Sequence, residues 1–82
     1  MNKNKRQKNE SEYDIWIESK NGNRIYSFEI IGKLGWKAKY LKEVNSSEIT
    51  IRFWQEVFDE KNILREIHEK YPLDKGHKKC KT

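Results

Sequence analysis

The sequence has little cysteine, proline or glycine, and it has no long apolar run. Cys80 is the only cysteine, so an internal disulfide is excluded, and the pattern around it does not resemble a zinc site. No run approaches the ~20 apolar residues of a membrane span, and no apolar secretory segment follows the basic N-terminus. We therefore expect a cytoplasmic protein in a reducing compartment, with no cofactor, no metal and no membrane contact.

The charge of the chain is the first positive signal. Its 82 residues are enough for one domain and carry a formal net charge of +5. Such a charge favours a polyanionic partner, namely nucleic acid, an acidic protein or an anionic membrane surface. The alternative is that the charge only keeps a small protein soluble.

The distribution of apolar residues divides the chain into three parts. Residues 1–12 contain no apolar residue after the initiator, which predicts a disordered basic arm. Residues 13–72 hold the aromatic and β-branched residues and predict a single β domain. Residues 73–82 are predicted to be a basic tail.

An Asn-Gly pair at positions 21 and 22 lies between two β-rich runs, residues 13–19 and 24–31. Asn-Gly is the strongest short signal for a β-hairpin, because a two-residue type I′ turn needs positive φ at both central residues. A turn centred there pairs apolar residues across the hairpin, which supports the register. The predicted pairs are Ser19 with Arg24, Ile17 with Tyr26, Ile15 with Phe28 and Tyr13 with Ile30.

Residues 36–44 and 49–58 predict two further strands. The first run fits a helix or a strand on its own, whereas the second alternates apolar and polar residues as a strand does. An antiparallel pairing of the two collects their apolar residues on one face, which favours a strand for the first run. The predicted pairs are Val44 with Ile49, Tyr40 with Phe53 and Trp36 with Val57, with Phe53 at the centre of the core.

Residues 60–71 are ambiguous. Asp59 is a fair helix N-cap and the apolar spacing that follows fits a helix, but as a strand the segment places Ile67 opposite Phe53. We favour the strand, and Pro72 ends either element. The predicted fold is mainly β, an antiparallel meander of about five strands in a small barrel-like or half-open sheet. The alternative is an α+β fold with a C-terminal helix over residues 60–71.

The opposite face of this meander is predicted to carry Trp54 among cations. An exposed aromatic residue beside cations suits single-stranded RNA, since stacking contributes ~1–3 kcal/mol per base. The alternative is that Trp54 packs in the core, because a small domain needs its large aromatic residues there. The predicted nucleic-acid-binding residues are Lys37, Lys39, Arg52, Trp54, Lys78 and Lys79.

The two histidines suggest acid–base chemistry, because the loop between them could bend to bring them together. Metal-independent RNA cleavage needs a base for the 2′-hydroxyl, an acid for the leaving oxygen and a cation for the phosphorane charge. The alternative is that both histidines are ordinary surface residues. The candidate catalytic residues are His68 or Glu66 as the base, His77 as the acid, and Lys70, Lys75 or Arg52 as the cation.

Two stretches near the end of the chain, WQEVFD at 54–59 and EIHEKYPLDKGHK at 66–78, resemble a known group of domains. They are similar to the C-terminal end of small toxin domains in bacterial polymorphic and contact-dependent toxin systems, over residues 35–79 of this chain. Such domains often end in a β-meander followed by a Pro, Asp and Gly-His stretch, and many are nucleases. The resemblance implies a functional role for His68 and His77, with Lys70, Asp74 and Lys75 as neighbours, and an acidic protein inhibitor as a partner.

Together these patterns predict a small basic RNA-binding β domain, and one hypothesis makes it a metal-independent ribonuclease of the bacterial toxin type. Two alternatives stay open. One is a non-catalytic nucleic-acid-binding module, and the other is a protein-interaction module of the phage or immunity type that binds an acidic partner. Salt-dependent RNA binding separates the last of these from the others. The sequence leaves the oligomeric state open.

Overall fold

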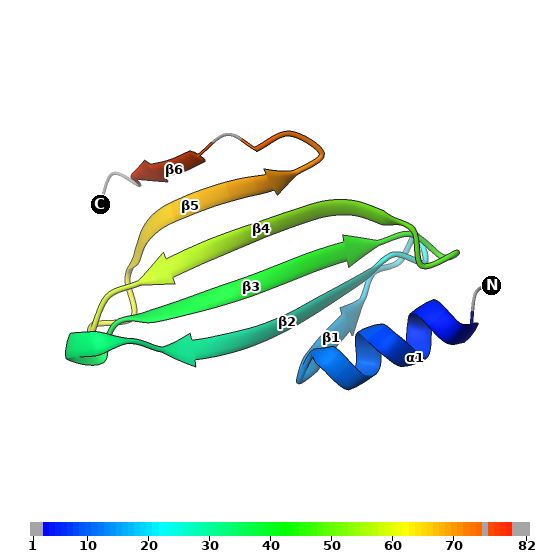
Figure 1. Ribbon diagram of the computed structural model, residues 1–82, viewed down its shortest axis with the longest axis horizontal. Helices are drawn as coiled ribbons and strands as arrows, with labels where there is room; N and C mark the ends of the chain where they lie inside the picture. Colours follow the sequence, from blue (N-terminus) through cyan, green and yellow to red (C-terminus); the bar gives the residue numbers. More distant parts are fainter. Residues whose placement is uncertain (1–2, 75, 80–82) are drawn as a thin grey trace.

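A computed structural model describes residues 3–74 and 76–79, which form one helix and one antiparallel sheet (Figure 1). The helix is α1 (Lys3–Glu12). The sheet order follows the chain, β1-β2-β3-β4-β5-β6. The strands are β1 (Ile15–Glu18), β2 (Arg24–Ile31), β3 (Lys37–Val44), β4 (Thr50–Phe58), β5 (Leu64–Tyr71) and β6 (Gly76–Lys79), and a short 3-10 turn, η1 (Lys33–Gly35), joins β2 to β3. The mainly β fold is as predicted, and within the described residues the six-stranded sheet is open.

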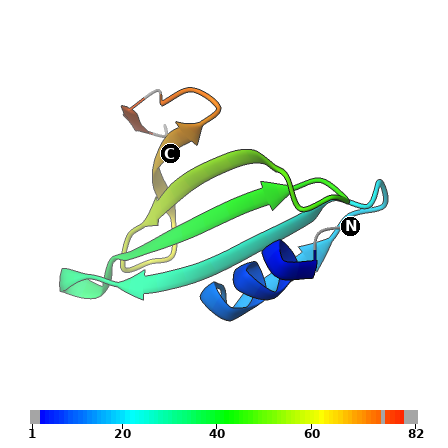
Figure 2. The ribbon, with the colours of Figure 1, turned by 45° about the vertical axis from the view of Figure 1, so that its right-hand side comes forward.

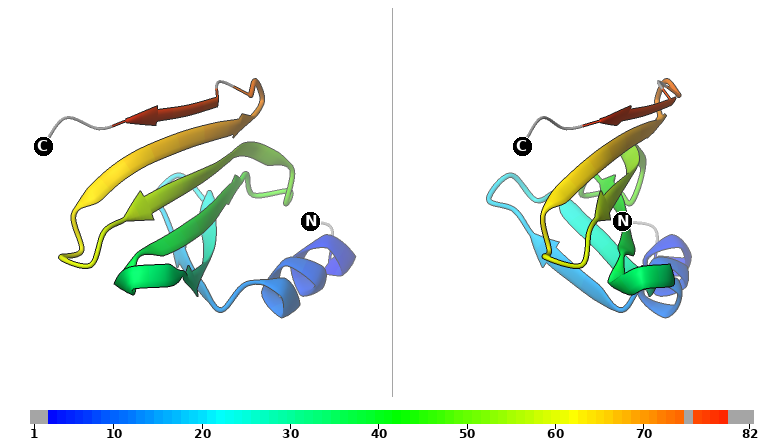
Figure 3. Two further views of the ribbon diagram at one scale, coloured as in Figure 1. Left: turned by 60° about the vertical axis from the view of Figure 1, so that its left-hand side comes forward. Right: turned by 90° about the vertical axis from the view of Figure 1, so that its left-hand side faces the viewer.

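The sheet twists from β1 to β6, and its two faces differ (Figures 2 and 3). We call the face on which α1 packs the helix face and the other the far face. Residues directly opposite each other on neighbouring strands share a face, so the register assigns the sides. The helix face carries Trp16, Tyr26, Phe28, Tyr40, Lys42, Val44, Phe53, Gln55, His68 and Tyr71, and the far face carries Ile15, Ile17, Ile25, Leu41, Arg52, Trp54, Ile67 and Glu69.

The core under α1 is small and aromatic. Tyr13, Tyr26 and Val44 are buried together, and Phe28 packs against them. The Tyr13 ring lies 5.7 Å from the Tyr26 ring and 5.4 Å from the Phe28 ring, and Phe28 stacks on Tyr40 at 5.1 Å. These separations are the usual ones for favourable aromatic pairs. Tyr13 thus fixes the point where the chain passes from α1 into β1.

The β1–β2, β3–β4 and β4–β5 connections repeat one turn geometry. In each, the first residue donates its N–H to the carbonyl of the residue four later, and its carbonyl accepts the N–H of the residue three later. The fourth residue is left-handed, so each loop is a type I turn followed by a bulge. The first residues are Ser19, Asn45 and Asp59, and the left-handed ones are Gly22 (φ 86°), Glu48 (φ 62°) and Asn62 (φ 64°).

The bulge residue explains why the predicted register of the first hairpin is wrong. The hairpin and the positive φ of Gly22 are confirmed, but Glu18 pairs with Arg24 and Trp16 with Tyr26. The loop therefore has three residues where two were predicted. A slip of one residue exchanges the faces of a strand, so Trp16 joins Tyr26 on the helix face and the neighbouring isoleucines of β1 lie on the far face.

The other two predicted registers are also wrong, because Asn45 bonds to Ile49 and Asp59 bonds to Ile63 across their loops, which are not the predicted pairs. Tyr40 lies opposite Gln55, a shift of two residues that keeps Tyr40 and Phe53 on one face. Gln55 also lies opposite His68, a shift of three from the predicted pairing, so Ile67 and Phe53 lie on opposite faces. Two register shifts between β4 and β5, at Phe53/Trp54 and Val57/Phe58, pass over Lys70 and Arg65 of β5 and change the pairing further. The predicted contact between Phe53 and Ile67 is therefore wrong.

The two ends of the chain also differ from the prediction. The disordered arm is wrong for residues 3–12, which form α1, and the basic tail is wrong for residues 76–79, which form β6 on the edge of β5. The alternative helix over residues 60–71 is excluded, because Leu64–Tyr71 is β5. That strand ends before Pro72, as predicted.

Candidate nucleic-acid interface

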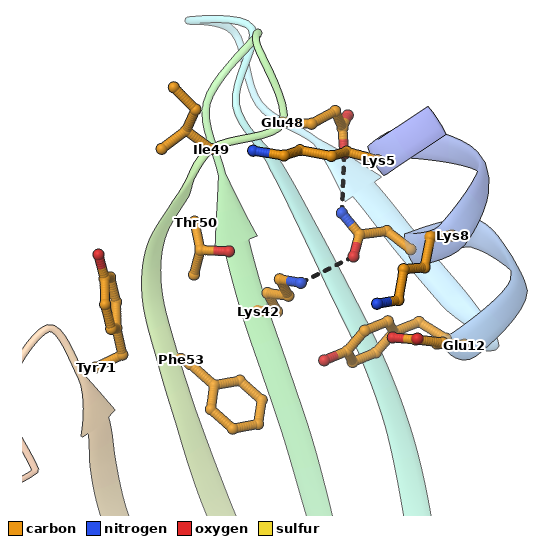
Figure 4. Close-up of a pocket in the computed structure, with 11 residues that line it drawn as sticks. Lys5, Lys8, Glu12, Lys42, Glu48, Ile49, Thr50, Phe53 and Tyr71 are labelled. Atoms are coloured by element: carbon orange, nitrogen blue, oxygen red, sulfur yellow. Dashed lines mark hydrogen bonds between the residues drawn. The ribbon is translucent and has the colours of Figure 1, made fainter. Parts of the chain in front are cut away.

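A groove of about 560 Å³ lies on the helix face, between α1 and strands β3 to β5 (Figure 4). Side chains from α1 reach toward the sheet on one side of it, and aromatic side chains of β4 and β5 lie on the other. Its lining residues are Lys5, Lys8, Asn9, Glu12, Tyr13, Lys42, Glu48, Ile49, Thr50, Phe53 and Tyr71. The groove thus has a polar wall and an aromatic wall.

The polar wall is cationic. Lys5 and Lys8 lie three residues apart on α1, which places them on one side of the helix. Lys42 of β3 adds a third ammonium group, which donates to Asn9 Oδ1 at 2.9 Å. The carboxylate of Glu48 is neutralised by Arg6, whose Nε lies 2.9 Å from Glu48 Oε1. Three lysines therefore line the groove together with two carboxylates, Glu12 and the ion-paired Glu48.

The aromatic wall is formed by Phe53 and Tyr71, which are register partners on β4 and β5. The Tyr71 side chain is 47% exposed, so it is available for stacking. The Lys70 ammonium lies 5.7 Å from the Phe53 ring and 5.2 Å from the Tyr40 ring, within the range of cation–π attraction. Aromatic faces next to cations can stack a base while its phosphates meet the lysines.

Glu48 holds the helical wall of the groove in place. Its carboxylate is buried, with the residue 2% exposed, and it accepts hydrogen bonds from Arg6, from Asn9 Nδ2 (3.1 Å) and from the Tyr26 hydroxyl (2.9 Å). Burial alone would raise the pKa of Glu48, but the hydrogen bonds from Asn9, Arg6 and Tyr26 outweigh it and the pKa is lowered. α1 is thus bound to the sheet through one buried anion.

Arg24 makes the second attachment of α1. It is buried on the helix face, donates to Glu10 of α1 at 2.7 Å, and pairs with Glu18 of β1. Its guanidinium carbon also lies 5.5 Å from the Trp16 ring centre. Burial opposes its charge, yet the hydrogen bonds to Glu18 and Glu10 raise the pKa of Arg24, which therefore stays protonated. Both ends of α1 are attached through polar contacts.

Trp54, the centre of the predicted RNA platform, is buried. It lies on the far face with 5% of its surface exposed. The Arg52 guanidinium stacks 3.8 Å from its ring centre, and its Nε1 donates to Glu56 at 3.1 Å. Arg52 itself is bound by the carboxylate of Glu69. The predicted platform is therefore wrong as an exposed stacking surface, because the protein's own side chains cover the indole.

Of the remaining predicted nucleic-acid-binding lysines, Lys37 and Lys39 share the far face with Trp54 and Arg52, as predicted, whereas Lys78 and Lys79 lie on β6. Lys37 lies 3.8 Å from Glu29 and 5.5 Å from the Phe58 ring, and Lys39 lies opposite Glu56 in the register. Lys78 and Lys79 are neighbours on β6, so they point to opposite faces.

His68 lies on the helix face, and so on the opposite side of the sheet from Trp54 and Arg52. Its Nε2 lies 2.6 Å from Asp74 Oδ1, and its Nδ1 is enclosed by protein atoms. The Gly76 N–H and then His68 lower the pKa of Asp74. The backbone of His77 lies directly opposite His68 on β6. The His77 side chain and the whole of Lys75 lie outside the described residues.

The other two candidate catalytic residues, Glu66 and Lys70, are both on β5 but have different neighbours. Glu66 pairs in the register with Val57 and Lys79, whereas Lys70 lies over the Tyr40 and Phe53 rings at the groove. Within residues 3–74 and 76–79, no group of three or more His, Cys, Asp and Glu side chains could hold a metal ion.

The groove residues of α1 were missed because this helix has no apolar stripe. Amphipathic helices are recognised by apolar residues at helical spacing, but the sheet-facing residues of α1 are polar. The available signal was the spacing of Arg6, Asn9, Glu10 and Tyr13, which repeats every three or four residues and ends on a tyrosine.

Neither a scan against models of known protein families nor searches of curated proteins and of solved structures find a match to this chain. The resemblance to bacterial toxin domains therefore stays a prediction. Among the described helices, none has the length and apolar character needed to cross a membrane. The functional inference rests on the geometry of the groove.

Proposed function

We propose that this protein binds single-stranded RNA in the groove between α1 and the sheet. The observation that carries the proposal is the pairing of two walls in one groove of about 560 Å³. Lys5, Lys8 and Lys42 form the cationic wall, and Phe53 and Tyr71 form the aromatic wall. The net charge of +5 supports the same class of ligand.

Each wall has a separate physical role. Bases stack on the aromatic rings with ~1–3 kcal/mol each and with little dependence on sequence. Phosphates meet the lysines and release counterions, so affinity falls steeply with salt. A duplex hides its base faces, which makes a single strand the better ligand for this groove.

The salt dependence of binding tests the cationic wall. Fluorescence anisotropy with a short labelled RNA should give a Kd that weakens with salt, and Lys8→Ala should reduce the slope of log K against log salt by about 0.7. Within the described residues, the polar contacts that attach α1 to the sheet come from Arg6, Asn9 and Glu10 and not from Lys8. The matched control is Lys61→Ala in the exposed β4–β5 turn, which should leave Kd and slope unchanged.

The aromatic wall is tested at Tyr71. Tyr71→Ala should weaken RNA binding by ~1–3 kcal/mol at every salt concentration, because it removes a stacking surface and no charge. Tyr71→Phe keeps the ring and should bind as the unmodified protein does. Equal affinity of all three proteins would exclude stacking at this position.

A ribonuclease is the second candidate, and the observation that favours it is the His68–Asp74 pair next to the backbone of His77. A carboxylate orients an imidazole for proton transfer. Against it, Asp74 occupies Nε2 while Nδ1 is enclosed, so His68 needs Asp74 to move before it can reach a substrate. We therefore favour RNA binding without catalysis as the function of this protein.

Incubation of labelled RNA with the protein in excess chelator tests the second candidate. An enzyme should cleave the RNA, and His68→Ala should lower the rate by about 100-fold or more while leaving Kd unchanged. Intact RNA after prolonged incubation would leave the non-catalytic module. Failure to bind RNA even at low salt would exclude both and favour an acidic protein as the partner of the lysines.

A further inference from the structure

The outer edge of β1 is apolar and exposed. Within four residues it presents Ile15 (57% exposed), Trp16 (39%) and Ile17 (68%). Edge strands are commonly protected by lysine, proline or a bulge, because their unpaired backbone groups otherwise pair with another strand. The opposite edge, β6, carries Lys78 and Lys79, whereas β1 has the sequence IWIE. β1 is therefore the unprotected edge of this sheet.

The hairpin register shows which backbone groups of β1 face outward. Ser19 donates its N–H to Asn23, so residue 19 faces β2. In an antiparallel pair the residues that bond to the partner alternate along the strand. Ile15 and Ile17 thus bond toward β2, whereas the N–H and C=O groups of Trp16 and Glu18 point away from the sheet. No strand of the described chain lies on that side.

We propose that a second copy of this chain pairs with β1 through an antiparallel β1–β1 contact centred on Trp16. In this register Trp16 lies opposite the second copy's Trp16. The outward N–H of each Trp16 donates to the outward C=O of the other. Ile15 then lies opposite the second copy's Ile17, and the reverse pair follows by symmetry. The contact is isologous, as a two-fold dimer requires.

The sequence around Trp16 favours a second copy over an unrelated strand. The order Ile-Trp-Ile is the same in both directions, so antiparallel pairing matches apolar with apolar on both faces. In the same register Glu18 lies opposite Asp14 of the second copy, and Arg24 already neutralises the Glu18 carboxylate. A four-residue strand pair buries less than the ~1,200 Å² of a standard interface, so the dimer is weak and depends on concentration.

The symmetry of this contact places both grooves on one side of the combined sheet. A two-fold axis perpendicular to the sheet keeps both helix faces, and so both α1 helices, on the same side. In this arrangement one long RNA can occupy two grooves, which raises affinity without any new contact. This statement about RNA rests on the proposed function. The dimer itself does not depend on RNA.

Sedimentation equilibrium without RNA, from about 10 µM to about 1 mM, tests the dimer. The unmodified protein should pass from monomer to dimer in this range. Ile17→Lys should weaken dimerisation by about 10-fold or more, because its ammonium would lie against apolar side chains of the second copy. Ile31→Lys is the matched control, since Ile31 is 71% exposed on β2 and away from β1, and it should dimerise like the unmodified protein.

Two results would overturn the proposal. One is a monomer at all concentrations, and the other is equal dimerisation of Ile17→Lys and the unmodified protein. Far-UV circular dichroism checks that each variant is folded. Because a short RNA fills one groove only, Ile17→Lys should bind it with unchanged Kd, so failure of the dimer and failure of RNA binding give different results.

Position 16 gives an independent measurement. On the proposed axis, Trp16→Cys in a Cys80→Ser background places two thiols opposite each other, within the Cα separation that a disulfide allows. Mild oxidation should then yield a covalent dimer, while Ile31→Cys in the same background should stay monomeric. Equal cross-linking of both variants would contradict a contact centred on Trp16.

Discussion

At the scale of single residues, Glu48 combines two unusual properties. It is a buried carboxylate, and it is the left-handed residue of the β3–β4 turn, with φ 62°. Glycine would adopt that backbone conformation with less strain. The carboxylate nevertheless accepts three hydrogen bonds there, from Arg6, Asn9 and Tyr26. Its side chain accounts for the attachment of α1, which glycine could not provide.

The lowered pKa of Glu48 predicts an acid-sensitive α1. Because the folded-state pKa lies below the ordinary value of 4.5, the stabilisation is complete above that value and is lost as pH falls through the lowered pKa. The helical signal should therefore decrease below about pH 4.5 before the sheet unfolds. Far-UV circular dichroism and hydrogen exchange of residues 3–12 measure the two events separately.

Glu48→Gln is the control for this titration. Glutamine keeps the size of the side chain and removes its charge, so α1 should be weakly attached at neutral pH and should show little further change in acid. An acid transition of α1 that is the same in Glu48→Gln would assign the effect to another carboxylate.

Leu34 gives a second prediction at this scale. It has φ 62° and is 88% exposed, so its side chain gains little from its position. A non-glycine residue in the left-handed region costs roughly 1–2 kcal/mol, hence Leu34→Gly should stabilise the protein by up to about 1 kcal/mol after the entropy cost of glycine. Urea unfolding measures the change. A loss of stability would mean that Leu34 has a contact that its exposure hides.

At the scale of elements, α1 is attached without apolar side chains of its own. A helix of ten residues is unstable alone in water, and this one has the polar sequence KNKRQKNESE. Its formation therefore depends on Arg6, Asn9 and Glu10 at the sheet, and on Tyr13 in the core. The cationic wall of the groove exists only while these contacts hold.

Arg6→Ala tests this dependence. It removes one partner of a buried carboxylate, so it should cost roughly 1–3 kcal/mol and speed hydrogen exchange in residues 3–12. Gln7→Ala is the matched control, because Gln7 is exposed on the same helix, and it should change neither. Loss of RNA binding in Arg6→Ala alone would link the helix to the groove.

The strands could be predicted from the sequence, but α1 and the loops could not. Alternation of apolar residues identified β2 and β4, and Asn21-Gly22 marked the first hairpin. The turn type of the first hairpin was wrong because its loop has one residue more than the shortest turn, and the other two loops, which begin at Asn45 and Asp59, were predicted at shifted positions. Two of these, Asn45 and Asp59, accept backbone N–H groups with their side chains, a local signal for the longer loop.

At the scale of the whole molecule, the far face depends on Trp54. The indole is the largest buried side chain there, between Leu41 and the Arg52–Glu69 pair. Trp54→Ala should cost ~3–5 kcal/mol, which is a large part of the stability of a small domain. Thermal or urea unfolding measures this cost. The folded fraction should still bind RNA with unchanged Kd, since the groove lies on the other face.

The candidate site could not be predicted because it depends on which face each strand presents. A register slip of one residue moves a whole strand to the other face, and the first hairpin slips by one and the β4–β5 pair by three. Trp54 and His68 were therefore placed on one surface, although the sheet separates them. The sequence pointed to aromatic rings beside lysines, and in the proposed groove Phe53 and Lys42 bring such groups together on the helix face.

The order of the strands has a consequence for how the molecule folds. Each strand pairs with its neighbour in the chain, from β1 to β6, so a short connection closes every strand pair. The entropy lost in closing each of these short connections is small. The sheet can therefore grow one strand at a time as the chain leaves the ribosome, and β1 stays exposed at the edge from the first hairpin onward.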